Sequence, residues 1–344
     1  MNKTPSFNVS SLMLLLSILV VVQPLISQVK KGETTMSAEE QLSPFDKAVK
    51  DLSSSDPYVR RQAAEQLGML RDIRAVPYLK KLLQDENPFV RQTAVDQLGL
   101  LRATDAVDDI IKVIKTDKEI QVRQSAVVSL GYIGVTNEKV IRPLIELLRS
   151  DVAPQLKYAT CNTLSILRST EPIPVLAELL SSDDVNLRRS AIYALGKISH
   201  PDSISALRSA LEKNVDDEVI AVDIIRFLVD FGDKESVDRF KIIYSTKQVS
   251  DKVRFFLAYG IAKLSQDITV LPVVKKGLKS SDETIKNAAI EAIGFIGDKE
   301  CLTTLLEMKK IEKSEYTKNL LEISISRLKN KYPQRESTPK SIKK

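Results

Sequence analysis

The chain has 344 residues and a formal net charge of +6, with 43% hydrophobic residues, 28% charged residues, 11 glycines and no tryptophan. This balance excludes an intrinsically disordered chain, and the scarcity of glycine and aromatic residues favours helices joined by short turns. The last fourteen residues hold five Lys/Arg against one Glu, and the body between the two termini keeps a formal charge of +2. A body so close to neutrality excludes the dense basic face that nucleic-acid binding requires.

The first 27 residues contain an apolar run at 9–22, VSSLMLLLSILVVV, preceded by Lys3 and followed by Pro24. The run is shorter than the roughly 20 residues of a spanning helix, which favours a signal peptide cleaved after Ser27 and a periplasmic or secreted protein. Two alternatives stay open: an uncleaved anchor in the inner membrane formed by residues 9–22, and a cytosolic product. Residues 28–43 are polar and are predicted to be a linker.

Residues 44–330 repeat with a period of 31 to 34 residues, counted from Val59. Eight equivalent positions start the repeats: Val59, Val90, Val122, Leu156, Leu187, Ile220, Val253 and Ile285. Offsets 0, 4, 8 and 11 from each start are almost all apolar. These offsets share one face of an α-helix, so each repeat is predicted to begin with a helix that buries this face.

The pairs Asp56-Pro57 and Asn87-Pro88 mark helix starts, because an Asx side chain caps free N–H groups and proline fits the first helical position. A second apolar segment follows each first helix, for example AVPYLKKLL at 75–83. Neither helix can cover its own apolar stripe, so the repeats are predicted to stack. The sequence therefore predicts an all-α array of about eight two-helix repeats, with a basic tail at 331–344.

The stretch DPYVRRQAAEQLGMLRDIRAVPYLKKLL (56–83) resembles the short HEAT repeat of the phycobilisome-lyase-like subclass. The resemblance covers residues 44–330 and implies a HEAT-like α-solenoid, an α-α superhelix with capping helices and with the second helices on its concave side. The name of the subclass implies chromophore attachment. The residues themselves offer no catalytic constellation for it, and a predicted export signal speaks against it.

Lone glycines recur inside the first helices, as at Gly68, Gly99 and Gly131, and an arginine recurs at offset 1, as at Arg60 and Arg91. The glycines lack the spacing of a phosphate loop, so close approach of helices is the favoured interpretation. The arginines could form an anion-binding ladder. In the family such arginines pair with acidic groups of neighbouring repeats, and the resemblance favours that role.

The sequence holds no metalloprotease motif, P-loop or nucleophile elbow. Deoxyhypusine hydroxylase resembles this array in fold, but its iron site uses several His-Glu pairs, and His200 is the only histidine of this chain. His200 is predicted to be a turn residue. Cys161 and Cys301 lie four repeats apart, too far for a disulfide, and are predicted to be small core residues. No metal, cofactor or catalytic residue is expected.

Two surfaces could bind a protein or peptide partner. On the second helices, a column of mixed charge contains Lys81, Lys112, Glu146 and Glu178. In the sixth and seventh repeats Val222, Phe255, Phe256 and Tyr259 occupy positions that are mostly polar elsewhere. An outward aromatic patch indicates an interface. The alternatives are that long turns fold over these rings, or that the register slips locally.

The sequence alone favours a non-enzymatic interaction scaffold that is exported or membrane-associated. The alternative is a lyase-like enzyme or enzyme accessory that binds a small molecule on the concave face.

Overall fold

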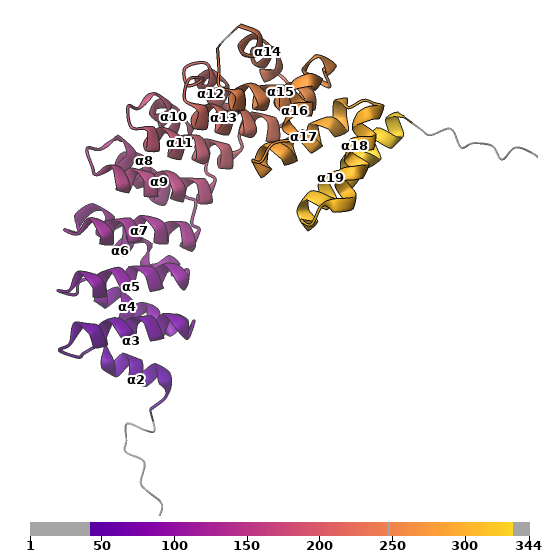
Figure 1. The fold of residues 1–344 in the computed structure, drawn as a ribbon. Helices are drawn as coiled ribbons and strands as arrows, with labels where there is room; N and C mark the ends of the chain where they lie inside the picture. Colours follow the sequence, from indigo (N-terminus) through magenta and orange to yellow (C-terminus); the bar gives the residue numbers. More distant parts are fainter. Residues whose placement is uncertain (1–41, 247, 333–344) are drawn as a thin grey trace, which may run out of the picture. The chain divides into compact units, whose positions relative to one another are not determined.

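The computed structural model describes residues 42–246 and 248–332 (Figure 1). The predicted signal peptide or anchor, nearly all of the linker and nearly all of the basic tail therefore lie outside the described residues. The chain divides into two compact units, the first ending at Arg71 and the second beginning at Asp72. Within the described ranges all regular elements are helices, and none is long and apolar enough to cross a membrane.

The described part of the first unit consists of α2 (Pro44–Asp51) and α3 (Pro57–Met69), which pack against each other. Each helix starts at a capping residue, and for α3 this is the Asp56 that the sequence indicates. The Ser43 hydroxyl accepts a hydrogen bond from the backbone N–H of Asp46 at 3.1 Å, and the Asp56 carboxylate accepts one from Tyr58 at 2.9 Å. Ala48, Ala63 and Leu67 are buried.

The second unit alternates first and second helices. Its first helices are α5 (Pro88–Leu100), α7 (Ile120–Ile133), α9 (Pro154–Leu167), α11 (Val185–Ile198), α13 (Glu218–Asp230), α15 (Asp251–Ser265), α17 (Glu283–Ile296) and α19 (Glu315–Lys331). Its second helices are α4 (Val76–Leu82), α6 (Val107–Thr116), α8 (Glu138–Arg149), α10 (Ile173–Glu178), α12 (Pro201–Leu211), α14 (Ser236–Thr246), α16 (Leu271–Gly277) and α18 (Lys299–Ile311). Short 3-10 turns precede some of the second helices, such as η2 (Thr104–Ala106) before α6.

Each first helix in this unit packs beside the first helix of the next repeat and against a second helix, as α5, α7, α9 and α11 show in Figure 1. Most of the predicted core positions are buried: Val90, Ala94 and Leu98 of α5 are 0% exposed. Offset 11 is less consistent, since Leu101 is half-buried and Leu70 of the first unit is 44% exposed. At the C-terminal end Leu321 and Leu328 of α19 are also fully buried. The predicted all-α solenoid of two-helix repeats is confirmed.

Glycines on the first helices admit the neighbouring helix at close range, as predicted. A Cβ atom at Gly99 would stand 2.8 Å from the Ser129 hydroxyl and 3.0 Å from the Cα of the same residue in α7. The Ser129 hydroxyl uses this closeness to donate a 3.0 Å hydrogen bond to the backbone oxygen of Val95. At Gly196 the space is filled by the ring of Phe227, which a Cβ atom would approach to 2.4 Å.

The recurring arginines hold neighbouring segments together. Arg91 donates to both carboxylate oxygens of Asp117, at 2.7 and 2.9 Å, and to the backbone oxygen of Asp85 at 2.9 Å. Arg188 donates to the backbone oxygen of Ser182, and Arg254 to that of Tyr244, each at 2.7 Å. Their donors are thus directed at backbone carbonyls and acidic partners of the array, as the resemblance implies.

Candidate functional site

The aromatic positions of the sixth and seventh repeats are buried. Val222, Phe255, Phe256 and Tyr259 are 6%, 5%, 1% and 5% exposed. The expectation that these side chains form an outward patch is therefore wrong. Their burial does not test whether a partner binds in this region. The rings are covered, as one of the alternatives held, but Phe255 is covered by helix α16 (Leu271–Gly277) rather than by a long turn.

Close approach of the second helix explains this burial. A Cβ atom at Gly277 of α16 would stand 2.4 Å from the Cε2 atom of Phe255, so the absence of a side chain there lets α16 cover the ring. Phe256 packs edge-on against both Phe255 and Tyr259, with ring centroids 5.3 and 6.3 Å apart. Such edge-to-face pairs are a favoured aromatic arrangement in protein cores.

Phe256 and Tyr259 nevertheless line one of the hollows of the molecule. This hollow, which we call the Tyr259 hollow, has a volume of about 400 Å³ and is bounded by α13, α15, α17 and α19. Its size falls in the usual range for small-molecule sites, and charged and hydroxyl groups supply much of its lining.

A charged hydrogen-bonded trio lies beside this hollow. The Tyr259 hydroxyl donates to the Glu291 carboxylate at 2.7 Å. The Lys263 ammonium lies 3.0 Å from the other oxygen of Glu291 and 3.1 Å from the Tyr259 hydroxyl. Burial, reinforced by the negative charge of Glu291, raises the pKa of Tyr259 well above its usual range, so the phenol keeps its proton.

The rim of the Tyr259 hollow offers further polar groups. Arg226 and Asp230 project from α13, and Tyr316, which is 70% exposed, projects from α19. The Asn287 side-chain oxygen accepts a 3.2 Å hydrogen bond from Thr317, which leaves its amide N–H groups for a ligand. Both hydrogen-bond donors and acceptors therefore surround the opening.

A second hollow of about 430 Å³ lies on the same side of the first helices, over α9, α11 and α13. We call it the Asp223 hollow. Its lining includes the rings of Tyr158 and Tyr193, the guanidinium of Arg189 and the carboxyl of Asp223. The Tyr158 hydroxyl donates to the Asp184 carboxylate, which fixes this ring. Tyr193 is 46% exposed and packs edge-on against Phe227.

Asp223 is a half-buried carboxyl between two arginines. Burial raises its pKa above the usual range and outweighs the opposing charges of Arg189 and Arg226. Asp223 lines one hollow and Arg226, three residues further along α13, lines the other. The two hollows are thus neighbours that share this helix.

The predicted charged column on the second helices is exposed but does not converge on one site. Glu146 lies 3.3 Å from Arg142, and Glu178 lies 3.4 Å from Arg149, while Lys112 extends into solvent. Lys81 lies over the ring of Tyr78 at 5.9 Å from its centroid. A partner on this column remains a prediction.

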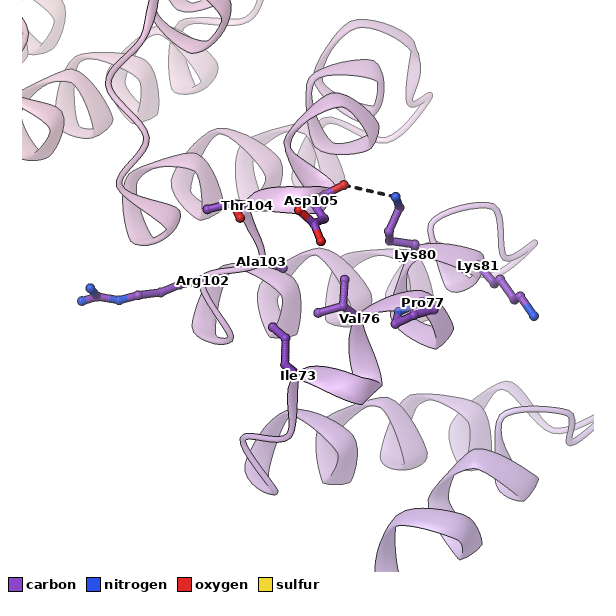
Figure 2. A pocket seen from close by; sticks show the side chains of 9 residues that line it. All are labelled: Ile73, Val76, Pro77, Lys80, Lys81, Arg102, Ala103, Thr104 and Asp105. Atoms are coloured by element: carbon purple, nitrogen blue, oxygen red, sulfur yellow. Dashed lines mark hydrogen bonds between the residues drawn. The ribbon is translucent and has the colours of Figure 1, made fainter.

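Lys81 also borders a hollow of about 640 Å³ that Figure 2 shows from close by. In that view the side chains of Lys81 and Arg102 point away from the hollow. Lys80 donates to the backbone oxygen of Asp105 at 3.1 Å and pairs with Asp109 at 2.8 Å, so its charge is already satisfied. Ile73, Val76, Pro77 and Ala103 supply the aliphatic part of its lining.

The surroundings of the histidine and the two cysteines indicate structural roles. The Nδ1 atom of His200 accepts a 3.3 Å hydrogen bond from the backbone of Asp202 and caps α12. Cys161 and Cys301 are free thiols whose pKa values burial raises to about 12 and about 11, so neither is a reactive thiolate at neutral pH. Among the described residues no group of three or more His, Cys, Asp or Glu is placed to hold a metal ion.

The trio beside the Tyr259 hollow was missed by sequence reasoning, although the sequence contains a signal for it. Tyr259 and Glu291 both stand at offset 6 of their repeats, one repeat apart. The same offset holds Asn162, Tyr193 and Arg226 in the preceding repeats. Reading this offset along the array, rather than along each helix, would have revealed a row of polar side chains.

Similar proteins include phycocyanobilin lyase alpha subunits and a bilin biosynthesis protein. The phycocyanobilin lyase subunit alpha of Picosynechococcus sp. (strain ATCC 27264 / PCC 7002 / PR-6) is 27% identical over 167 residues, which are 48% of this chain and 54% of that protein. The bilin biosynthesis protein PecE of Nostoc sp. (strain PCC 7120 / SAG 25.82 / UTEX 2576) is 26% identical over 172 residues, 49% of this chain and 66% of PecE. The chain spans about half the length of the lyase subunit that it matches.

Two solved structures are also similar. The complex of CpcE and CpcF of phycocyanin lyase from Nostoc sp. PCC7120 shows 21% identity and a TM-score of 0.41, with 77% of this chain and 97% of that chain covered. An engineered protein shows 19% identity and a TM-score of 0.46, with 83% of this chain and 89% of that chain covered.

These relatives correct the functional expectation drawn from the sequence. A non-enzymatic scaffold was expected, whereas the sequence relatives are named as lyase subunits and as a bilin biosynthesis protein. That expectation rested on the absence of His, metal and nucleophile motifs. Such an absence does not exclude a site whose side chains come from separate repeats and therefore leave no local motif.

A HEAT-repeat family model matches residues 45–140 and 141–225, which together make up more than half of the chain. The buried repeat positions and the paired helices described above agree with this match. The chain belongs to the HEAT-repeat family.

Proposed function

We propose that this chain is a subunit of a lyase-type enzyme that binds a bilin-like small molecule on its first helices. The observation that carries the proposal is the similarity to two phycocyanobilin lyase alpha subunits and to PecE, at 26 to 28% identity. The name "subunit alpha" suggests that a second chain takes part in the reaction. The Asp223 and Tyr259 hollows supply the binding and acid–base groups that such a subunit needs.

The side chains that line the Asp223 hollow suit the chemistry of a bilin. A bilin is an open chain of pyrrole rings that carries N–H donors, carboxylates and a flat conjugated system. The carboxyl of Asp223 would accept from the N–H groups, and Arg189 would pair with a carboxylate. The exposed ring of Tyr193 offers a face for stacking against the conjugated system.

The Tyr259 hollow suits the proton transfers of a lyase reaction. A lyase adds a group across a double bond or eliminates it, so one enzyme group must take a proton and another must give one. Glu291 is the acceptor in this assignment, and the phenol of Tyr259 is the donor because its raised pKa keeps it protonated. Lys263 holds both in place through contacts of 3.0 and 3.1 Å.

Titration of the purified chain with phycocyanobilin, followed by absorbance, tests the binding step. Binding is expected to shift and sharpen the visible absorption band, and the double variant Asp223→Asn/Arg189→Ala is expected to bind at least about tenfold more weakly, since two charged contacts are removed. Lys112→Ala, on the second helices, serves as the matched control. Equal binding by the wild type and the double variant would overturn this assignment of the site.

The chemical step is tested with N-acetylcysteine as the thiol. Tyr259→Phe preserves the ring and removes the donor, so thiol addition to the bound bilin is expected to slow by about 100-fold while bilin affinity stays within twofold. An unchanged rate in Tyr259→Phe would exclude this residue as the proton donor.

The apolar run 9–22 supports a further proposal that the protein is exported, or held at the inner membrane by this run. Fractionation of cells that produce a C-terminally tagged chain tests it. A mature protein that begins after Ser27 in the periplasmic or secreted fraction supports cleavage, whereas full-length protein in the membrane fraction supports the anchor. Full-length protein in the cytosol contradicts both.

A further inference from the structure

A ridge of two lysines separates two further hollows in the seventh and eighth repeats. Lys276 and Lys279 line both hollows, whose volumes are about 640 and 550 Å³. The larger hollow lies between α16 and α18, and the smaller one lies where α15, α16 and α17 meet. We call this surface the lysine ridge.

The floor of each hollow is apolar. The larger one contains Leu278, Met308 and Ile311, and Ile311 is 79% exposed. The smaller one contains Phe255 and Ile285, so the aromatic residue predicted to bind a partner lies at the base of this hollow. An exposed isoleucine beside a concave apolar floor gains free energy when a partner covers it.

Two neighbouring lysines are already neutralised by acidic residues. Lys275 lies 3.0 Å from Asp298 and 2.7 Å from Glu300, and these carboxylates raise its pKa. Lys286 lies 2.6 Å from Glu283 and 3.8 Å from Glu312.

The ridge itself keeps its charge. Lys276 and Lys279 are exposed, and within residues 42–246 and 248–332 no ion pair joins either of them to a carboxylate. The ridge therefore presents two unpaired positive charges between two hollows that contain apolar side chains.

We propose that the lysine ridge binds a short acidic segment of a partner protein, with two acidic side chains on Lys276 and Lys279 and an apolar side chain in each hollow. The charge of the ridge selects the acidic residues, and the apolar floors select the residues on either side of them. A nucleic acid fits less well, because the ridge offers only two unpaired lysines, whereas binding of a phosphate backbone needs a longer basic surface.

Fluorescence anisotropy with a labelled peptide of sequence GSLEELGS tests the proposal on the full chain. Saturable binding is expected, and Lys276→Glu/Lys279→Glu is expected to weaken it at least about tenfold, since two attractive contacts become repulsive. The matched control is Lys118→Glu/Lys213→Glu, two exposed lysines that follow α6 and α12, which is expected to bind like the wild type. Both double variants are expected to keep the melting temperature of the wild type within about 3 °C, because exposed charges contribute little to stability.

Three further measurements decide between binding modes. The peptide GSSEESGS, which lacks the leucines, is expected to bind at least about tenfold more weakly, and Ile311→Asp is expected to weaken the binding of GSLEELGS. Equal binding of the two peptides would overturn the role of the apolar floors. Tighter binding of a single-stranded DNA 12-mer than of the peptide, or no peptide binding by the wild type, would overturn the proposal itself. Bilin binding is measured separately and does not enter these outcomes.

Discussion

The early and late repeats of the second unit solve the same packing problem in different ways. Between α5 and α7 a glycine faces a serine, and the serine hydroxyl bonds to the neighbouring backbone at 3.0 Å. Between α11 and α13 a glycine faces the ring of Phe227, and between α14 and α15 Gly260 faces the ring of Phe240. Large rings in glycine notches make the fifth to seventh repeats depart from the sequence motif while the stacking of helices is preserved, and at the last notch Gly294 again faces a serine, Ser324. Departure from a repeat motif can therefore reflect a different core as readily as an interface.

The largest expected effect comes from charging the aromatic core of the late repeats. Phe256→Glu places a carboxylate at a position that is 1% exposed, which should cost more than about 4 kcal/mol and unfold the late repeats. Circular dichroism during urea unfolding measures this loss in the free energy of unfolding. The matched control is Phe89→Glu in α5, because Phe89 is 63% exposed and should tolerate the charge within about 0.5 kcal/mol. A fully stable Phe256→Glu variant would mean that the ring is not core.

Replacing a notch glycine by alanine distinguishes the tightly filled notches from the more open ones by the change in the free energy of unfolding. In Gly196→Ala the new methyl group would stand 2.4 Å from the Phe227 ring, and the resulting repacking should cost about 1–3 kcal/mol. In Gly131→Ala the nearest atom is 3.4 Å away, so the better helix propensity of alanine should stabilise the protein by about 0.5–1 kcal/mol. Equal changes in the free energy of unfolding for the two variants would contradict this difference.

The ion pairs of the aspartates Asp117 and Asp282 also differ between the two regions. The pH dependence of stability should reveal this difference. Burial would raise the pKa of Asp117, but the hydrogen bonds from Arg91 and the backbone prevail and hold this pKa below its usual range. A depressed carboxyl pKa stabilises the fold above the unfolded value of about 3.9, and this contribution is lost as the pH falls through the folded pKa.

Asp117→Asn should therefore destabilise the protein by about 1–3 kcal/mol at pH 7 and by clearly less at pH 3. Chemical unfolding at the two pH values measures the difference. Asp282→Asn is the counterpart in the late repeats, since Asp282 pairs with Lys252 at 3.0 Å in a more exposed setting. If Asp282→Asn lowered the free energy of unfolding as much as Asp117→Asn, the two regions would not differ in this respect.

The smallest expected effect concerns the hydroxyl groups in the early notches. Ser129→Ala removes the 3.0 Å hydrogen bond to Val95 and should cost about 0.5–1.5 kcal/mol. Ser190→Ala in α11 removes an exposed hydroxyl bonded within its own helix, and should leave the melting temperature almost unchanged. If Ser129→Ala left the free energy of unfolding unchanged, the close approach of the helices, rather than the hydrogen bond, would be what stabilises the early notches.

The repeat pattern predicted the fold because it depends on contacts within one helix and between adjacent helices. Val90, Ala94 and Leu98 recur at helical spacing, and Asp56 and Asn87 cap their helices as the sequence indicates. The burial of Phe255 could not be predicted from this pattern, because it depends on Gly277 of another helix. The Tyr259 trio was missed for a similar reason, since Tyr259 and Glu291 meet only after two repeats have stacked.

Helix α13 is common to the two hollows on the first helices. Asp223 on this helix faces the Asp223 hollow, and Arg226, about one turn further on, faces the Tyr259 hollow. A ligand bound in one hollow would therefore change the electrostatic potential in the other, because the two charges stand on the same helix.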